Sequence, residues 1–395
     1  MNASIQVRLR HAVRNRNTKS AGNPEPFIGL EDIAGGAGRL VSEVLAEKAA
    51  TDALVFETGD VLFGKLRPYL AKSVAPTERG TCTSELLVMT PTMNLDSRFL
   101  LYMTLSEPWL DWAITSSYGS KMPRTSWDAM ADFSFALPPL DEQRRIADFL
   151  DTETTRLDAL ASLRERQRTL LAGELASILE AALVLPYLGT RVPLMHLTDP
   201  RRPVQYGIVL PGPDWPGGVP IIKGGDIAGR RLNLEDLKRT DPEIERRYSR
   251  SRVRGGDYVV AIRGSVGEIA PVPASLNGAN LTQDSARIAP YGCDAAWLGA
   301  VLRTPDLQNQ MRQQTTGATI KGINISELRR LRVPVPPRSE QQELSRLVAE
   351  SFSRSEAADE ALRASVTLLR ERRQALITAT VTGRFDVTTA AAARH

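Results

Sequence analysis

Basic and hydrogen-bonding side chains recur beside short strand-like segments in both halves of this 395-residue chain. The segment Gly59–Pro68 predicts a buried strand that opens into a basic turn, and Gly256–Arg263 repeats that pattern. Lysine and arginine contact DNA phosphates, whereas amide, hydroxyl and guanidinium groups can bind base edges. We therefore predict a DNA-binding set made of Lys65, Arg67, Tyr69, Lys72, Tyr118, Ser120, Lys121, Arg124, Tyr206, Arg263, Ser265, Gln283, Thr319, Lys321 and Asn324.

The alternative for each of these residues is an ordinary solvated surface. The densest basic run, which spans Arg246–Arg254, is by itself more typical of a solvated loop than of a site. The chain has 42 arginines against 8 lysines and a formal net charge of +4. Arginine forks onto phosphates and guanine edges, but a GC-rich genome also favours its codons. Composition alone therefore favours a nucleic-acid partner only weakly.

Catalytic motifs are missing from the sequence. Gly59–Lys65 has the spacing of a phosphate-binding loop, but Leu66 stands where a serine or threonine must hold Mg²⁺. There is no Asn-Pro-Pro-aromatic or Asp-Pro-Pro-Tyr segment of the kind that adenine methyltransferases use. Two cysteines and three histidines are too few for a zinc cluster. We predict no catalytic residue, no metal and no cofactor bound by this chain.

A repeated phrase marks the elements that would position the basic loops. Leu137–Gln143 returns as Val335–Gln341, with the two Pro-Pro pairs 198 residues apart. Proline ends a strand, and acidic residues in a first turn complement the helix dipole. A seven-residue ladder of apolar side chains follows each copy and predicts two coiled-coil helices, at about 141–183 and 339–382. The ladder residues are Leu150, Leu157, Leu171 and Ile178, then Val348, Leu362, Leu369 and Leu376.

The segments that precede the two helices also match each other, at offsets of 194 to 199 residues. A helix is expected from Phe99 to Ala113. The tetrapeptide Leu163–Arg166 recurs at Leu369–Arg372 with a longer offset, which indicates about eight extra residues in the second helix. The predicted divisions are a first recognition domain at 1–138, a first helix at 139–185, a second recognition domain at 186–336, a second helix at 337–385 and a tail at 386–395.

The combined pattern resembles the specificity subunit of type I restriction-modification enzymes. The resemblance covers nearly the whole chain and rests on the repeat, on Leu-Pro-Pro-Leu-x-Glu-Gln and Val-Pro-Pro-x-x-Glu-Gln, and on Gly-Asp-Val-Leu-Phe-x-Lys-Leu-Arg-Pro-Tyr-Leu. It implies an α+β fold in which two target-recognition domains are related by pseudo-two-fold symmetry and separated by two long antiparallel coiled-coil helices.

The resemblance also implies partners. The chain would bind a bipartite site in double-stranded DNA and dock two modification (methyltransferase) subunits, which restriction (ATPase/nuclease) subunits join. S-adenosylmethionine, ATP and Mg²⁺ are expected on those partner subunits. We predict docking by residues at the helix entrances and on the ladders, namely Glu142, Gln143, Leu150, Leu157, Glu340, Gln341, Leu362 and Leu369.

Alternatives stay open at this point. The chain could be the specificity subunit of a modification-only or related phage-defence system, or, in another class, a coiled-coil adaptor between proteins. A fused enzyme is a third possibility, which the missing motifs disfavour. The first residues lead into charged sequence without an apolar signal core, and no uninterrupted apolar run approaches the length of a membrane span. We therefore expect a cytoplasmic protein without a membrane partner.

Overall fold

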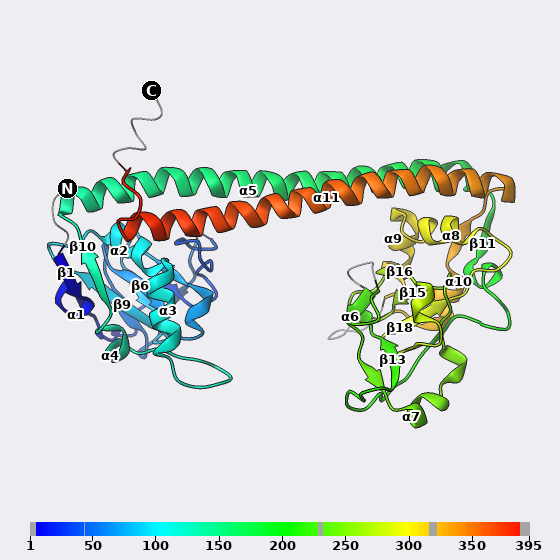
Figure 1. The fold of residues 1–395 in the computed structure, drawn as a ribbon, viewed down its shortest axis with the longest axis horizontal. Coiled ribbons are helices and arrows are strands. Elements are labelled where there is room, and N and C mark those ends of the chain that lie inside the picture. Colours follow the sequence, from blue (N-terminus) through cyan, green and yellow to red (C-terminus); the bar gives the residue numbers. More distant parts are fainter. Residues whose placement is uncertain (1–4, 43, 228–231, 316–321, 388–395) are drawn as a thin grey trace. The chain divides into compact units, whose positions relative to one another are not determined.

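A computed structural model describes residues 5–42, 44–227, 232–315 and 322–387. The chain divides into two compact units. Unit 1 comprises Met1–Glu165 with Arg363–His395, and unit 2 comprises Arg166–Leu362. Helices α5 (Leu140–Leu183) and α11 (Arg338–Val381) contribute to both units, so each unit contains one α+β domain and one stretch of a helix pair (Figure 1).

The domain of unit 1 is built from three small sheets. Their orders are β1-β10, β2-β9-β6-β7 and β4-β3-β8-β5, and among the described strands only β3 and β8 pair in parallel. The strands are β1 (Ile5–Arg8), β2 (Val13–Asn15), β3 (Glu25–Ile28), β4 (Glu47–Lys48), β5 (Leu54–Phe56), β6 (Val61–Gly64), β7 (Ser73–Val74), β8 (Gly80–Cys82), β9 (Leu86–Pro91) and β10 (Ser134–Leu137). The short helices are α1 (Leu9–Ala12), η1 (Pro68–Leu70), α2 (Ser97–Thr104), α3 (Glu107–Thr115) and α4 (Trp127–Met130).

The described residues of the unit 2 domain also form three sheets, ordered β11-β19, β12-β18-β15-β16 and β14-β13-β17. The strands are β11 (Arg191–Pro193), β12 (Gln205–Tyr206), β13 (Val219–Ile222), β14 (Arg239–Thr240), β15 (Tyr258–Ala261), β16 (Ile269–Pro271), β17 (Asn280–Leu281), β18 (Ser285–Ile288) and β19 (Arg332–Pro334). The helices are η2 (Leu185–Tyr187), η3 (Leu194–Leu197), α6 (Gly224–Ile227), α7 (Pro242–Arg246), η4 (Ser249–Ser251), η5 (Ala274–Leu276), α8 (Ala295–Val301), α9 (Pro305–Gln313) and α10 (Ile325–Arg330).

The internal repeat extends to individual hydrogen bonds. The buried side chain of Gln143 accepts a 2.8 Å hydrogen bond from the backbone N–H of Asp96, the N-cap of α2. Gln341 does the same at 2.8 Å for Asp294, the N-cap of α8. Each glutamine also donates to the carbonyl of the first proline in its Pro-Pro pair. The repeated phrase therefore ties the start of a long helix to the cap of a domain helix in each unit.

A second repeated feature is the Gly-Asp turn before the central strand of each domain. Gly59 and Gly256 have φ of 93° and 89°, a region that glycine occupies without steric cost. The buried carboxylate of Asp60 accepts from the Glu57 N–H and pairs with Arg16 at 3.0 Å. Asp257 accepts from the Arg254 N–H and pairs with Arg202 at 2.5 Å.

The long helices confirm the coiled-coil prediction, but the predicted insertion of about eight residues in the second helix is wrong. Both α5 and α11 have 44 residues, so no eight-residue insertion distinguishes them. The two tetrapeptides contact each other in an antiparallel pair, in which Glu165 lies 3.7 Å from Arg370. In unit 2 the same antiparallel pairing brings Arg168 within 2.8 Å of Asp359.

The helix expected from Phe99 to Ala113 is two helices, α2 and α3. Ser106 is the N-cap of α3, and Pro108 occupies its first turn. Proline has no N–H to continue the hydrogen bonds of α2, which explains why the helix begins anew there.

Each domain packs its core on the ends of the long helices within its unit. In unit 1, Ile146 and Leu150 of α5 and Ile377 of α11 join the core that surrounds Trp109. In unit 2, Leu179 of α5 and Val348 of α11 join the core around Trp297. Burying such aliphatic side chains stabilises each junction by about 1.5–3 kcal/mol per residue.

The sequence predicts no membrane span, but one helical stretch is long and apolar enough to cross a membrane. Among the described residues, the helical stretch Leu140–Tyr187, which comprises α5 and η2, contains an 18-residue window with a mean hydropathy of 1.6, of which 17% is buried. By length and composition such a helix could cross a membrane. A single helix of this kind is only a weak indication, because core helices of soluble proteins pass the same test.

Candidate nucleic-acid interface

Unit 2 contains a cavity of about 600 Å³ at the ends of its central strands. The cavity collects four residues of the predicted DNA-binding set, Tyr206, Arg263, Gln283 and Asn324. The remaining lining residues are Val209, Ile262, Asp284, Gly322, Ile323 and Ile325. Side chains 118 residues apart in sequence, from Tyr206 to Asn324, therefore meet at one place.

Backbone hydrogen bonds hold these residues together. The N–H of Ile262, just after β15, donates to the carbonyl of Asp284 at 2.8 Å, and the N–H of Ile323 donates to the carbonyl of Ile262 at 2.9 Å. Arg263 forms a β-bridge with Gly322. The N–H of Gln283 donates to the carbonyl of Ile208 at 2.9 Å. The cavity walls are therefore set by main-chain bonds, and the side chains are available for a ligand.

The polar side chains of the cavity are not used to stabilise the fold. Asn324 is the N-cap of α10, yet its side chain makes no capping hydrogen bond. Within the part of the chain that the structure describes, the side chains of Arg263, Gln283 and Asp284 also accept or donate no hydrogen bond. A guanidinium, two carboxamides and a carboxylate supply the donors and acceptors that fit base edges in a DNA groove.

Unit 1 has the same main-chain arrangement with different chemistry. The N–H of Lys65 donates to the carbonyl of Glu85 at 2.9 Å, and the N–H of Thr125 donates to the carbonyl of Lys65 at 3.0 Å. Here the polar groups pair internally, because Arg124 forms a 2.7 Å ion pair with Glu85. Burial is the main cause that lowers the pKa of Lys65. The two units therefore present different side chains on one backbone plan.

Among the other predicted residues of unit 1, most side chains are exposed, and one is hydrogen-bonded within the domain. Arg67 is exposed at φ 51°, and its N–H donates to the carbonyl of Pro123 at 2.7 Å, which joins the turn after β6 to the loop before α4. The Lys72 side chain already makes a hydrogen bond within the domain, because its Nζ donates to the carbonyl of Leu30 at 2.5 Å. The exposed residues on this side are Tyr69, Tyr118, Ser120 and Lys121.

In unit 2, Ser265 is exposed but does not line the cavity. Thr319 and Lys321 lie outside the described residues.

The structure corrects part of the docking prediction. Gln143, Gln341, Leu150 and Leu157 are all buried, with at most 7% of their surface exposed. The two glutamines bind backbone groups of their own unit, and the leucines face inward, so a partner subunit could not reach them. Glu340 is exposed but accepts a 2.7 Å hydrogen bond from Tyr187. Glu142, Leu362 and Leu369 are half-buried.

Sequence reasoning missed one feature of unit 2. Glu245 is 2% exposed and pairs with Arg252 through two hydrogen bonds of 2.6 and 2.7 Å. No periodicity marks this glutamate as buried, because it lies in a strongly charged stretch. The only available signal was its proximity to the arginine run.

The described residues contain no group of three or more histidine, cysteine or acidic side chains that could hold a metal ion.

Comparison with known proteins identifies the family. Residues 16–166 and 213–351 match the model of the type I restriction modification DNA specificity domain. The chain belongs to this family, and it carries two copies of the domain.

Two curated relatives are specificity subunits from Escherichia coli. The chain is 27% identical over 273 residues to the type I restriction enzyme EcoBI specificity subunit, a match that covers 63% of this chain and 57% of that protein. It is 29% identical over 91 residues to the EcoDI specificity subunit, covering 23% of this chain and 20% of that one. The matched segments thus span 57% of the first of these relatives and 20% of the second.

The fold also matches a solved structure. A chain from a type I R-M system, studied for complex assembly and conformational transition, superposes with a TM-score of 0.73 at 20% identity. The match covers 97% of this chain and 98% of the other. This likeness confirms the fold of two recognition domains with a coiled coil.

Proposed function

We propose that this chain is the DNA sequence-recognition subunit of a type I restriction-modification complex. One observation carries the proposal. The two domains repeat one arrangement of strand-end loops, hydrogen bond by hydrogen bond, but place different side chains on it. Such a pair of readers fits a site with two unlike halves, because base edges are discriminated by the donors and acceptors that face them.

The chain reads DNA and leaves the chemistry to other subunits. Two modification subunits would supply S-adenosylmethionine and methylate adenine, and restriction subunits would supply ATP hydrolysis and cleavage with Mg²⁺. The membership of the chain in the specificity-domain family supports this division of work.

Two other functions predict different behaviour. A modification-only system would lack the restriction subunit but give the same methylation pattern. A coiled-coil adaptor between proteins would show no sequence-selective binding of duplex DNA. The open carboxamides of Gln283 and Asn324 favour DNA reading over the adaptor, since an adaptor does not require them.

The experiment is a reconstitution. The purified chain alone is expected neither to methylate nor to cut DNA. The chain mixed with its modification subunit and S-adenosylmethionine is expected to methylate adenines within one two-part sequence. Methylation or cleavage by the purified chain alone would refute the non-catalytic assignment.

A further inference from the structure

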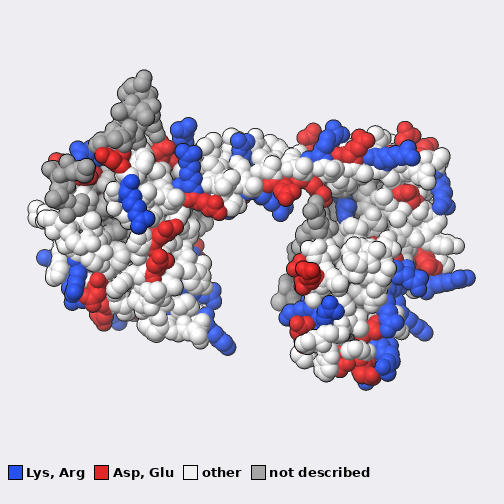
Figure 2. All heavy atoms as spheres, in the orientation of Figure 1, with Lys and Arg blue, Asp and Glu red and all other residues white. Residues whose placement is uncertain are grey.

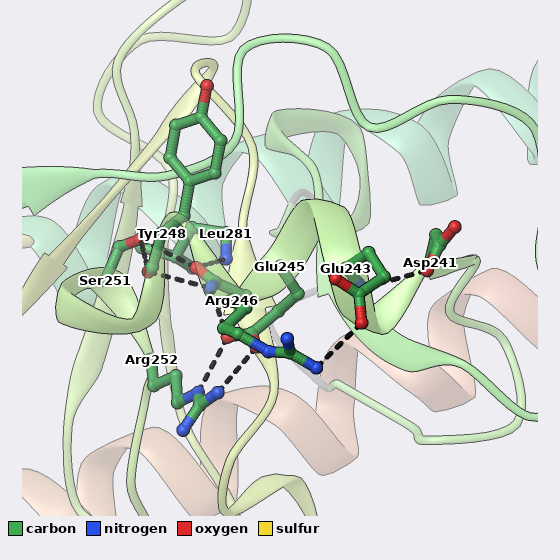
Figure 3. A network of polar contacts seen from close by, with 9 residues as sticks. Asp241, Glu243, Glu245, Arg246, Tyr248, Ser251, Arg252 and Leu281 are labelled. Atoms are coloured by element: carbon green, nitrogen blue, oxygen red, sulfur yellow. Dashed lines mark hydrogen bonds and ion pairs between the residues drawn. The ribbon is translucent and has the colours of Figure 1, made fainter.

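The arginine run of unit 2, defined as Arg246–Arg254, is anchored by a buried carboxylate. Glu245, near the end of α7, accepts hydrogen bonds from the guanidinium of Arg252 at 2.6 and 2.7 Å and from the Asn280 amide at 2.8 Å. Figure 3 shows the Arg252 side chain turned toward that carboxylate. The hydrogen bonds from Arg252 are the largest cause that lowers the pKa of Glu245. The run is therefore an ordered segment rather than a loose solvated loop.

A second buried group holds the backbone of the run. Arg287 is 1% exposed and donates to the carbonyls of Arg250 and Arg252 at 2.8 and 2.6 Å. It also donates to the carbonyl of Pro203 at 3.2 Å. These acceptors are neutral, and burial lowers the pKa of Arg287 to about 10, which keeps the group charged at neutral pH. Arg287 therefore adds positive charge behind the surface of the run.

Three arginines of the run keep their charge uncompensated. Arg246 pairs with Glu243 at 2.7 Å, and Arg252 pairs with Glu245. Arg247, Arg250 and Arg254 are exposed, and no carboxylate of the described chain lies within ion-pair distance of their side chains. The run itself contains no acidic residue. Figure 2 shows lysine and arginine side chains gathered along one side of unit 2.

We propose that Arg247, Arg250 and Arg254 form a surface that contacts the phosphodiester backbone of duplex DNA. The planar fork of arginine matches phosphate oxygens, and an anchored backbone lowers the entropy lost when the side chains bind. The inference rests on the proposed function and adds a separate role. The cavity residues read bases, whereas these arginines strengthen binding irrespective of base sequence.

The test is the salt dependence of DNA binding by the assembled methyltransferase complex. Each phosphate contact contributes about −0.9 to the slope of log affinity against log salt on duplex DNA. The triple variant Arg247→Gln, Arg250→Gln and Arg254→Gln is expected to reduce the steepness of that slope by about 3. The loss should be equal on duplexes with and without the methylated sequence, and the methylated sequence itself should not change.

A matched control removes three exposed cations elsewhere in unit 2, by Lys238→Gln, Arg312→Gln and Arg330→Gln. It makes the same change in net charge and is expected to leave the slope near the wild-type value. An unchanged slope in the arginine variant, or an equal loss in the control, overturns the assignment while the proposed function stands. A wild-type complex that shows no sequence selectivity overturns the proposed function and this inference together.

Discussion

Replacing Gln283 and Asn324 together by alanine is expected to weaken binding to the methylated sequence about 100-fold. Both side chains line the cavity of unit 2, and neither is used to cap or brace the fold. A well-placed carboxamide pair with a base is worth about 1–3 kcal/mol, so losing two removes about 2–6 kcal/mol of discrimination, a range that includes the ~2.7 kcal/mol of a 100-fold change. Binding to duplexes of unrelated sequence should stay at the wild-type level, because those duplexes are held through phosphates. Competition binding with the assembled complex measures both quantities.

The control for this variant is Asn309→Ala with Gln313→Ala. Both residues are exposed on α9 and lie outside the cavity, so their loss removes similar groups without touching the proposed reading site. If the Gln283→Ala and Asn324→Ala variant bound cognate and unrelated duplexes with an equal loss of affinity, that result would contradict base reading by the cavity. It would indicate a general contact with DNA instead.

Gln341→Leu is expected to lower the free energy of unfolding of unit 2 by about 2–4 kcal/mol. Leucine has a similar size but leaves the N–H of Asp294 and the carbonyl of Pro336 without partners. Each unsatisfied buried polar group costs about 1–3 kcal/mol. Chemical denaturation of the purified chain measures the loss.

The neighbouring substitution Gln342→Leu is a close control, since Gln342 is exposed in the same helical turn and makes none of these bonds. It should leave the stability of the chain nearly unchanged. If Gln341→Leu instead preserved the stability of the isolated chain and abolished assembly with the modification subunit, the docking role predicted from sequence would be right.

Gln143→Leu is expected to lower the free energy of unfolding of unit 1 in the same way. The loss of stability should be larger than for Gln341→Leu, because the Gln143 side chain also donates to the carbonyl of Asn94.

Periodicity and the repeated Pro-Pro phrase predicted the long helices well, because heptads and proline act locally. The predicted bounds of about 141–183 and 339–382 lie within one residue of those of α5 and α11. The equal lengths of the helices could not be read from the tetrapeptide offset. The two similar tetrapeptides contact each other in the folded antiparallel pair, and a contact of this kind depends on tertiary structure.

For the candidate site, too, the sequence predicted local features but not the contacts that depend on tertiary structure. The structure brings Arg263, Gln283 and Asn324 to one cavity through main-chain bonds that recur at matching positions in the two halves. The sequence could not show which polar residues were already satisfied. Lys72 and the two repeated glutamines are bound by backbone groups, and Glu245 is buried by contacts that form only in the folded domain.

The most direct test of the central claim is a map of methylated adenines in DNA from cells that carry this chain with its modification subunit. In the wild type we expect one two-part sequence. In the Gln283→Ala and Asn324→Ala variant we expect one half of that sequence to be altered or lost and the other half to be kept. A methylation pattern that is unchanged by this variant, or that persists when the chain is absent, would contradict the claim that this chain reads the DNA.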